Sequence, residues 1–326
     1  MSDVAVIIVN YNAAQLAIEA VESVRARDHG GRTIEIHLVD NASPRGDAAV
    51  LAAALEDRGW APGVTLYAEA VNHGFGRGNN LVLDRLAERE DPPEFVFLLN
   101  PDAALKNEAI AIMVDFLVAR PKAAVTGARC IKPDGRSVPA SFRFPNIVSV
   151  FIAALKFGPV TRLLAGWRMV IDPEAGTRRV DWVSGASMLA RFDALRAEGF
   201  FDPAYFLSFE EVDLMRRLAR QGWETWYVAE AEVTHEEGAS TDVKSARTER
   251  VRRPAYWYES WRIYFRAAYG RLGTLGIGAI WMLAALMNNG LSALRRKEPA
   301  APRHFFRDFW AVALRPLFGL EARPYD

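Results

Sequence analysis

The chain has 326 residues, of which 51% are hydrophobic and 25% are charged, and this composition excludes a disordered, collagen-like or low-complexity protein. Its 40 Lys and Arg residues balance its 40 Asp and Glu residues, so the overall charge gives no reason to expect nucleic acid as a partner. The single cysteine, Cys130, excludes an internal disulfide and a zinc site built from several cysteines.

Short apolar runs alternate with helix-like stretches over the first 130 residues. In chain order, strands are predicted at 4–9, 34–39, 64–68 and 95–99, then from Val125, and much later at 224–228. A helix is predicted at about 14–27, where apolar residues recur at helical spacing. This alternation predicts an α/β fold with a mostly parallel, twisted sheet and helices on both of its faces.

Polar residues follow several predicted strands at the edge where such sheets bind their ligands. Asn10 and Tyr11 follow the first strand, Asp40 follows the second, and Asn100 and Asp102 follow the fourth. A carboxylate at Asp102, with a second acid at Asp40, suits a Mg²⁺ or Mn²⁺ ion that holds a diphosphate, because these cations prefer oxygen ligands. The alternative is that the Asn-Pro-Asp sequence forms an ordinary turn.

The segment 72–80 is rich in glycine, with Gly74, Gly76 and Gly78 at every second position. Glycines let the backbone approach a ligand, and exposed amides can face phosphate, so this segment is a candidate phosphate contact; the alternative is a tight turn. The spacing differs from the dinucleotide fingerprint, and it follows the third strand instead of the first, which disfavours a hydride-transfer enzyme.

Pro and Gly residues interrupt the pattern over 132–180, which also holds an apolar stretch at 147–164. This region is predicted to be an insertion over the ligand edge of the sheet; the alternative is a plain packing helix.

Acidic residues Glu210, Glu211 and Asp213 begin a predicted helix, where the helix dipole favours negative charge. Asp213 has the helical spacing to pair with Arg216 or Arg217. Glu211 follows an apolar, aromatic segment, where a carboxylate can have a raised pKa and serve as a general base.

The C-terminal region is basic, with 15 basic and 6 acidic residues from Lys244 onward. It contains an uncharged run, 272–294, that would reach ~34 Å as a helix, enough to cross a bilayer. Aromatic and basic residues crowd 256–269, as at a bilayer interface, while glycines and Asn288 weaken a simple span. Three alternatives follow: helices lying in the interface, a spanning or re-entrant helix, and a buried soluble hairpin.

Seven segments, in their order, resemble glycosyltransferase family 2, whose members are inverting enzymes of GT-A fold, and most of all its bacterial rhamnosyltransferase-like branch. The segments are 6–12, 39–43, 72–80, 99–102, 183–189, 209–214 and 233–240. The resemblance implies a GT-A type, Rossmann-like domain at 1–240. The basic, aromatic and apolar pattern of the remaining residues predicts a helical, membrane-associating region at 241–326.

The resemblance also implies where a nucleotide-sugar donor binds. Asn10 and Tyr11 would line the nucleotide pocket, and Asp40 would contact the base or the ribose. Gly74 and Asn79 would pack along the nucleotide-sugar.

The remaining implied roles concern the reacting groups. Asp102 matches the second acid of the family's Asp-x-Asp motif and would bind metal, whereas Asn100 replaces the first acid and would contact the sugar or ribose. His235 would complete the metal site. Glu211 matches the catalytic base; because Glu-Glu stands where the family has Glu-Asp, Glu210 is the alternative.

These roles imply a metal-dependent inverting glycosyltransferase that uses Mg²⁺ or Mn²⁺. It would move a sugar, with rhamnose as the candidate, from a nucleoside diphosphate to a lipid-linked or other glycan acceptor in cell-envelope polysaccharide synthesis. The basic tail implies an anionic membrane surface as a partner, at the cytoplasmic face of the inner membrane, with peripheral or monotopic attachment or a single spanning helix. The alternatives are a nucleotidyltransferase and a non-catalytic, membrane-tethered binding protein.

Overall fold

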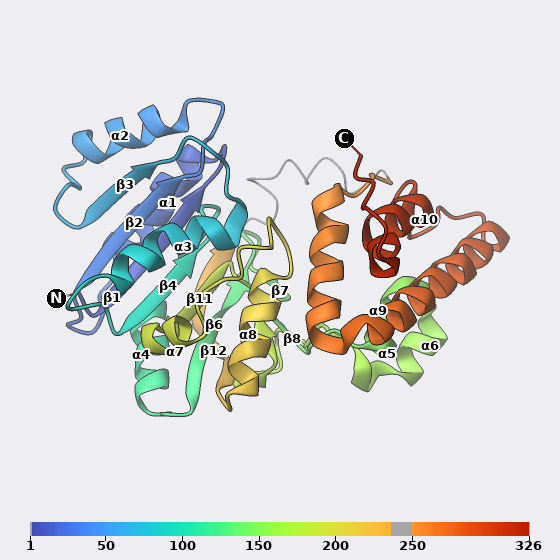
Figure 1. The fold of residues 1–326 in the computed structure, drawn as a ribbon. Coiled ribbons are helices and arrows are strands. Elements are labelled where there is room, and N and C mark those ends of the chain that lie inside the picture. Colours follow the sequence, from blue (N-terminus) through green and yellow to red (C-terminus); the bar gives the residue numbers. More distant parts are fainter. Residues whose placement is uncertain (1, 236–249, 326) are drawn as a thin grey trace. The chain divides into compact units, whose positions relative to one another are not determined.

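The computed structural model describes residues 2–235 and 250–325, which divide into two compact units (Figure 1). The first, here called the sheet unit, comprises the described residues up to 142 together with 171–203 and 210–235. The second, the helical unit, comprises 143–170, 204–209 and 250–325. The expected domain boundary at residue 240 lies outside the described residues.

The sheet unit is built on one large mixed sheet with the strand order β3-β2-β1-β4-β11-β6-β12-β5. Its strands are β1 (Val4–Asn10), β2 (Ile34–Asp40), β3 (Val64–Ala68), β4 (Phe95–Leu99), β5 (Ala103–Leu105), β6 (Ala123–Ile131), β11 (Ser187–Arg191) and β12 (Glu224–His235). Short strands β7 (Ser137–Val138) and β9 (Arg178–Val180) pair with β6 and β12, and β8 (Ser141–Phe142) pairs with β10 (Trp182–Val183). All six strands expected from the sequence are present.

The six strands expected from the sequence run parallel to one another, but β11 runs antiparallel between β4 and β6, and the short strands β5, β7 and β9 also pair antiparallel with their neighbours. The sequence analysis did not predict β11 as a strand. Because β11 is antiparallel to both β4 and β6, these two strands run in the same direction. Strand β12 is parallel to β6, so the carboxyl ends of β4, β6 and β12 lie at the same edge of the sheet.

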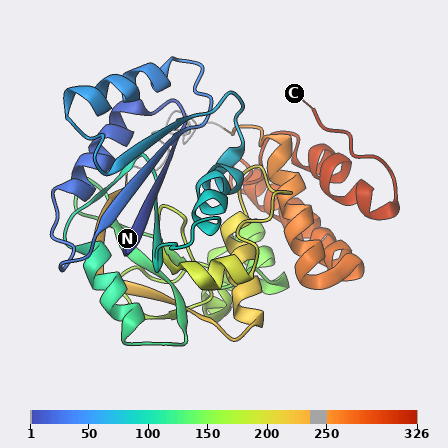
Figure 2. The ribbon, with the colours of Figure 1, turned by 60° about the vertical axis from the view of Figure 1, so that its left-hand side comes forward.

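Helices cover both faces of this sheet (Figure 2). They are α1 (Ala14–Arg25), α2 (Asp47–Asp57) and α4 (Ala109–Val118) on one face, and α3 (Gly74–Ala87), α7 (Phe192–Ala197) and α8 (Glu210–Arg220) on the other. Strand β1 serves both layers: Val6 and Ile8 face the first, whereas Ala5 and Ile7 face the second. This alternation follows from the two-residue period of a strand and explains the continuous apolar run.

The helical unit consists of α5 (Ile147–Leu155), α6 (Gly158–Leu163), α9 (Ala255–Leu294) and α10 (Phe305–Asp308) with short 3₁₀ and π-helical turns. Helix α9 changes direction at Gly270, whose φ of 67° and ψ of 179° are not helical. Trp261, Phe265 and Phe309 form its aromatic core, with Trp261 4.5 Å and 4.8 Å from the rings of Phe265 and Phe309.

The segment expected as an insertion, 132–180, is divided between the units, since 143–170 packs with the C-terminal helices. The Tyr269 hydroxyl donates to the Pro145 carbonyl at 2.6 Å, and the Asn288 amide donates to the Leu155 carbonyl at 2.9 Å. The side chain of Asn288 therefore forms hydrogen bonds with backbone groups inside the helical unit.

One expectation about the tail is wrong in part: three of the aromatic side chains before the uncharged run lie in a protein core, whereas Tyr256, Trp257 and Tyr269 are half-buried. Tyr258, Trp261 and Tyr264 are buried, because they lie on the face of α9 that packs into the helical unit. They belong to a protein core and do not mark a bilayer interface.

Candidate functional site

Asn10 and Asp40 meet at the carboxyl ends of β1 and β2, where the parallel register sets them opposite each other. Asn10 Nδ2 donates to Asp40 Oδ1 and to Asp47 Oδ2, each at 2.9 Å, and Asn10 Oδ1 accepts from the Ala13 amide at 3.2 Å. All three polar side chains are buried. This network holds the turn from β1 into α1, and it leaves the neighbouring Tyr11 exposed to 37%.

Asp47 is a member of this network that the sequence analysis did not identify. Its Oδ2 also accepts from the Ala14 amide at 2.9 Å, so it joins α2 to the start of α1. An acidic residue in the first turn of a helix is a visible signal. Its partnership with Asn10, however, depends on strand pairing and not on local pattern.

The glycine segment is neither a free phosphate loop nor a tight turn, because Gly74 begins α3 and the following residues are helical. A Cβ atom on Gly76 would lie 3.0 Å from Cβ of Phe201, and one on Gly78 would lie 3.0 Å from Cγ1 of Val9. Gly76 and Gly78 thus allow α3 to pack closely on its neighbours.

Asparagines hold the start of α3 in place. Asn41, at the end of β2, accepts from the His73 amide at 2.9 Å and donates to the Gly74 carbonyl at 3.0 Å. Asn79 is buried and donates to the Phe75 carbonyl at 2.9 Å, while its Oδ1 has no hydrogen bond among the described residues. The structure therefore places Gly74 and Asn79 on one helix, whose start is hydrogen-bonded to Asn41 at the end of β2.

Asp102 and His235 are brought together by strand pairing. The antiparallel register of β5 and β12 sets Ala103 opposite His235, and Asp102 immediately precedes Ala103. His235 Nε2 lies 3.2 Å from Asp102 Oδ1, although the geometry is not that of a hydrogen bond. Within the described residues, Asp102 Oδ1 is buried without a hydrogen-bond partner, and Asp102 as a whole is 6% exposed.

This pair fits a divalent cation, since a buried carboxylate oxygen without a donor and an imidazole nitrogen face each other. Carboxylate and imidazole are suitable ligands for Mn²⁺. Within the described part of the chain, no group of three or more His, Cys, Asp or Glu side chains is placed to hold a metal ion.

The Asn100-Pro101-Asp102 segment forms a turn, and this turn leaves the Asp102 side chain free to serve as a metal ligand. The Ala103 amide donates to the Asn100 carbonyl at 3.1 Å, which closes a turn. The Asn100 amide donates to the Ala186 carbonyl at 2.9 Å and so anchors the turn beside β11. Asn100 and Asp102 thus lie at the same edge of the sheet as Asn10 and Asp40.

Glu210 and Glu211 begin α8 but differ in exposure: Glu210 is 2% exposed, whereas Glu211 is half-buried. Burial and the neighbouring Glu211 carboxylate raise the pKa of Glu210 well above its usual value, and burial raises the pKa of Glu211. In both side chains Oε2 has no hydrogen bond among the described residues. Ser208 and Phe209, directly before α8, have φ angles of 74° and 71°, a strained conformation that clusters at functional sites.

Asp213 has a structural partner, as its spacing predicts. Arg217 Nε donates to Asp213 Oδ2 at 2.9 Å, and the same guanidinium donates to the carbonyls of Glu198 and Phe200, both at 2.6 Å. Asp213 therefore holds the loop before α8, and Glu211 is the less buried of the two remaining carboxylates, although its Oε2 is itself buried.

The chain matches a known protein family over most of its length. The family model described as "Glycosyltransferase like family 2" matches residues 2–259. An N-acetylglucosaminyl-diphospho-decaprenol L-rhamnosyltransferase of Mycobacterium tuberculosis is 30% identical over 218 residues, which are 64% of this chain and 69% of that protein. Rhamnosyltransferase WbbL of Escherichia coli K12 is 28% identical over 167 residues, 50% of this chain and 61% of that protein.

Solved structures share the fold. A mannosyltransferase from Pyrobaculum calidifontis, in complex with GDP-Man and Mn²⁺, has a TM-score of 0.56 at 16% identity, covering 90% of this chain and 75% of that one. Residues 1–349 of TarS from S. aureus have a TM-score of 0.52 at 14% identity, covering 98% and 83%. The resemblance drawn from seven short segments is confirmed: the chain belongs to glycosyltransferase family 2 and is a glycosyltransferase of GT-A fold.

Proposed function

We propose that this glycosyltransferase is metal-dependent and inverting, and that it moves L-rhamnose from a nucleoside diphosphate to a lipid-linked glycan acceptor at a membrane. The observation that carries the metal dependence is the Asp102–His235 pair, which the sheet holds at the edge where the donor-binding candidates lie. Rhamnose and the lipid-linked acceptor are proposed because the Mycobacterium tuberculosis relative is an N-acetylglucosaminyl-diphospho-decaprenol L-rhamnosyltransferase.

Glu211 is the proposed base. An acceptor hydroxyl oxygen attacks the anomeric carbon, the bond from that carbon to the diphosphate breaks, and the hydroxyl proton passes to the Glu211 carboxylate. Glu211 suits this role better than Glu210, because it is half-buried while Glu210 is almost wholly enclosed. A carboxylate pKa raised by burial makes a stronger proton acceptor than an ordinary surface carboxylate.

The donor is proposed to bind along the carboxyl edge of the sheet, with Asp102 and His235 holding the Mg²⁺ or Mn²⁺ ion. When bound, that ion would offset the negative charge that develops on the leaving diphosphate. Tyr11, Gly74 and Asn79 would contact the nucleotide-sugar, and Asn100 its sugar or ribose. Asn10 and Asp40 would shape the nucleotide pocket through their mutual hydrogen bond.

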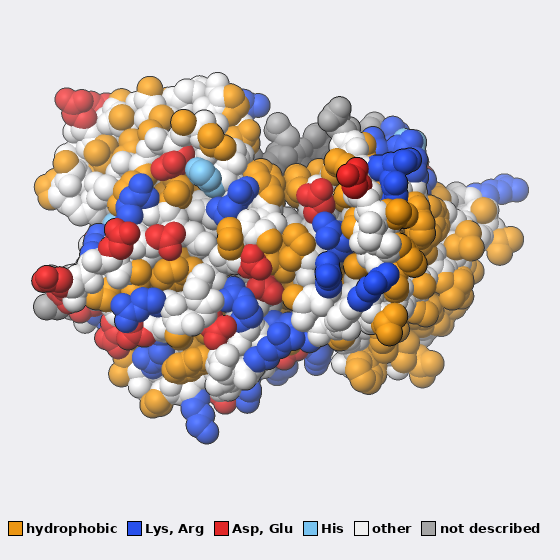
Figure 3. Space-filling model, in the orientation of Figure 1, with side chains coloured by type: hydrophobic (Ala, Val, Ile, Leu, Met, Phe, Trp, Pro, Cys, Tyr) orange, Lys and Arg blue, Asp and Glu red, His pale blue; other side chains and the backbone are white. Residues whose placement is uncertain are grey.

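Helix α9 supports membrane attachment. It is the one helix in the described part of the chain that is long and apolar enough to cross a membrane, and only 28% of its most apolar stretch is buried. Exposed apolar side chains recur along its second half at Leu272, Leu283, Leu286 and Leu294. Figure 3 shows many hydrophobic side chains at the surface of the helical unit.

The opposite side of this helix is packed into the helical unit at Ile277, Ala284 and Asn288. A helix with one face buried in protein and an uncharged apolar outer face suits a position in the membrane interface better than a free span. Arg295, Arg296 and Lys297 follow at its end and would face anionic lipid. We propose that the enzyme is attached at the cytoplasmic face of the inner membrane, where anionic lipid would meet this basic end of the helix.

The experiment that tests the enzyme class is a panel of nucleoside diphosphate sugars, including a rhamnose donor, with and without Mn²⁺ or Mg²⁺. Binding and slow hydrolysis should be metal-dependent for one donor and should be lost in Asp102→Ala. Binding of a donor that is equally tight without metal and in Asp102→Ala would contradict the metal dependence. Transfer of another sugar would show that the proposed donor, a rhamnose nucleotide, is wrong.

A further inference from the structure

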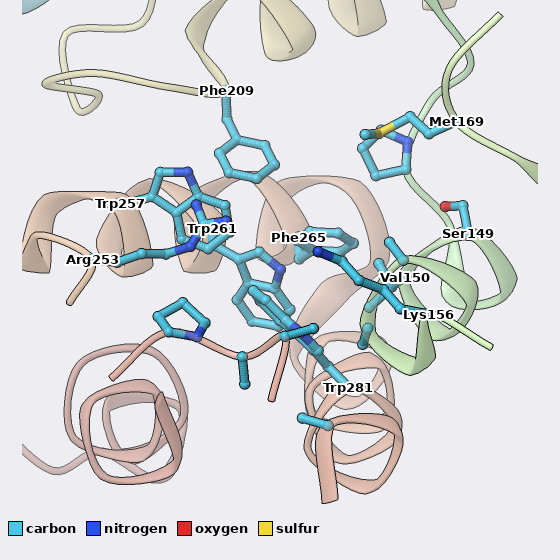
Figure 4. A pocket seen from close by; sticks show the side chains of 17 residues that line it. Ser149, Val150, Lys156, Met169, Phe209, Arg253, Trp257, Trp261, Phe265 and Trp281 are labelled. Atoms are coloured by element: carbon cyan, nitrogen blue, oxygen red, sulfur yellow. The ribbon is translucent and has the colours of Figure 1, made fainter. Parts of the chain in front are cut away.

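A cavity of about 260 Å³ lies inside the helical unit. Trp257, Trp261 and Phe265 line it from the first half of α9, and Trp281 lines it from the second half (Figure 4). Helix α5 supplies small and apolar residues on the other side, including Val150 and Ala154. The kink at Gly270 lets one helix enclose this space from two sides.

Two cationic side chains reach the cavity. Figure 4 shows Arg253 and Lys156 extending into it, Arg253 from just before α9 and Lys156 from the end of α5. The Arg253 guanidinium stacks over the Trp257 ring, 3.9 Å from its centroid, and burial lowers its pKa. Across residues 2–235 and 250–325, no carboxylate forms an ion pair with either cation.

A guanidinium taken partly out of water without a counter-charge is unfavourable, so this cavity favours an anion beside Arg253. The rest of the lining is apolar and aromatic, so it favours a hydrocarbon chain. The two preferences together describe a ligand whose apolar chain ends in an anionic group. The volume is just below the ~300–1,000 Å³ of typical small-molecule pockets, so it suits the end of a long lipid and not its whole length.

We propose that this cavity binds the diphosphate end of the acceptor's prenyl carrier, with the first prenyl units against the tryptophans and the diphosphate beside Arg253 and Lys156. This proposal rests on the proposed function, which supplies a lipid-linked acceptor. Phe209, which also lines the cavity, stands two positions before the proposed base, Glu211, in the sequence. The cavity is distinct from the donor-binding candidates, all of which belong to the sheet unit.

The direct test is titration of the full chain, in detergent-free buffer, with farnesyl diphosphate as a short carrier. Tryptophan fluorescence and calorimetry should both report saturable binding to one site, because three tryptophans line the cavity. Farnesol should bind about tenfold more weakly or worse, since it lacks the charge that pairs with Arg253. Inorganic pyrophosphate should leave the fluorescence unchanged, and dihexanoyl phosphatidylglycerol should not displace farnesyl diphosphate.

Four variants separate the contributions. Arg253→Gln should weaken farnesyl diphosphate binding about tenfold, and Arg253→Lys should restore most of it. Ala154→Trp should abolish binding by filling the cavity. Arg271→Gln is the matched control, since it removes an exposed cation of α9 outside the cavity and should bind as the parent does. Equal melting temperatures would show that the variants are folded.

Three binding results would overturn the proposal: no saturable binding by the parent chain, equal affinities for farnesol and farnesyl diphosphate, or unchanged affinity in both Arg253→Gln and Ala154→Trp. Transfer assays separate it from the proposed function. With a short prenyl-diphosphate-linked acceptor, Arg253→Gln should raise the KM for acceptor about tenfold and leave the KM for donor unchanged. Transfer by the parent with an unchanged acceptor KM in Arg253→Gln refutes the cavity proposal alone. Absence of transfer by the parent refutes the proposed function.

Discussion

Nε2 of His235 and Oδ1 of Asp102 lie 3.2 Å apart, although the two residues are separated by more than a third of the chain. The backbone register of β5 against β12 brings them together, since Ala103 pairs with His235 and Asp102 precedes Ala103. A pair held by the sheet, and not by flexible loops, is preorganised for a ligand.

We therefore expect both residues to govern Mn²⁺ affinity. Added Mn²⁺ should raise the melting temperature of the parent chain, because a ligand that binds only the folded state stabilises it. Asp102→Asn should abolish this shift, and His235→Gln should weaken the apparent Mn²⁺ affinity about tenfold or more. Differential scanning fluorimetry over a Mn²⁺ series measures both.

The matched control is Asp134→Asn, which changes an exposed carboxylate that already pairs with Arg136 in the turn between β6 and β7. It should respond to Mn²⁺ as the parent does. An undiminished Mn²⁺ shift in Asp102→Asn would show that the ion binds elsewhere.

Glu211→Gln should lower kcat by ~10²–10⁴-fold, the usual contribution of a general base, with little change in donor KM. Glu210→Gln is the control at the same helix end, and it should change kcat by less than about tenfold, because Glu210 is almost wholly enclosed. Initial rates of nucleoside diphosphate release measure both. If the larger loss occurs in Glu210→Gln, the base is Glu210.

Glu210 should make the stability depend on pH. Burial and the Glu211 carboxylate raise its pKa in the folded state, so the folded chain retains a proton at pH values where the unfolded chain has lost it. The stabilisation is present below the unfolded-state pKa of ~4.3 and is lost as the pH rises toward the raised value. Glu210→Gln cannot ionise and should escape this loss.

The measurement is urea unfolding of the parent and of Glu210→Gln between pH 4 and pH 8. The variant should gain stability relative to the parent as the pH rises. A difference in unfolding free energy that stays constant across this range would mean that the pKa of Glu210 is the same in both states.

Gly127 in β6 allows close packing of Val183, because a Cβ atom at Gly127 would lie 2.6 Å from Cβ of Val183. Gly127→Ala should therefore destabilise the chain by ~1–3 kcal/mol, the usual cost of overpacking. Adding Val183→Ala should recover part of the loss, with a favourable coupling of ~0.5–3 kcal/mol in a double-mutant cycle. Strictly additive effects would show that the two positions do not meet.

The outer face of α9 should bind membranes. The double substitution Leu283→Glu/Leu286→Glu changes two exposed residues and should reduce co-sedimentation with anionic vesicles at least about tenfold, because burying one Leu is worth ~1.5–3 kcal/mol. Val50→Glu, at an exposed apolar position of the sheet unit, is the control. Substitution is preferable to truncation, since removing α9 would expose the face of α5 that packs against it. Equal sedimentation of all three proteins would exclude α9 as the membrane contact.

Local pattern was sufficient for much of the fold. The run Val4–Asn10 is a strand buried on both faces, as its continuous apolar sequence predicts, and Phe95–Leu99 has the predicted bounds. The start of α3 could not be read this way, because three glycines within five residues disfavour a helix. Contacts of Gly76 and Gly78 with Phe201 and Val9 require those glycines, and such contacts involve residues distant in the sequence.

By itself, the sequence determined the α/β class, the family, and the polar residues that end the strands, because strand and helix periods and the order of short motifs are local properties. The tertiary structure decided which of these residues meet: Asn10 with Asp40 and Asp47, and Asp102 with His235. It also decided which side of α9 faces inward, so that the Trp261 side chain is buried and the Leu283 side chain is exposed. These outcomes depend on strand register and helix packing, in which each position is set by partners elsewhere in the chain.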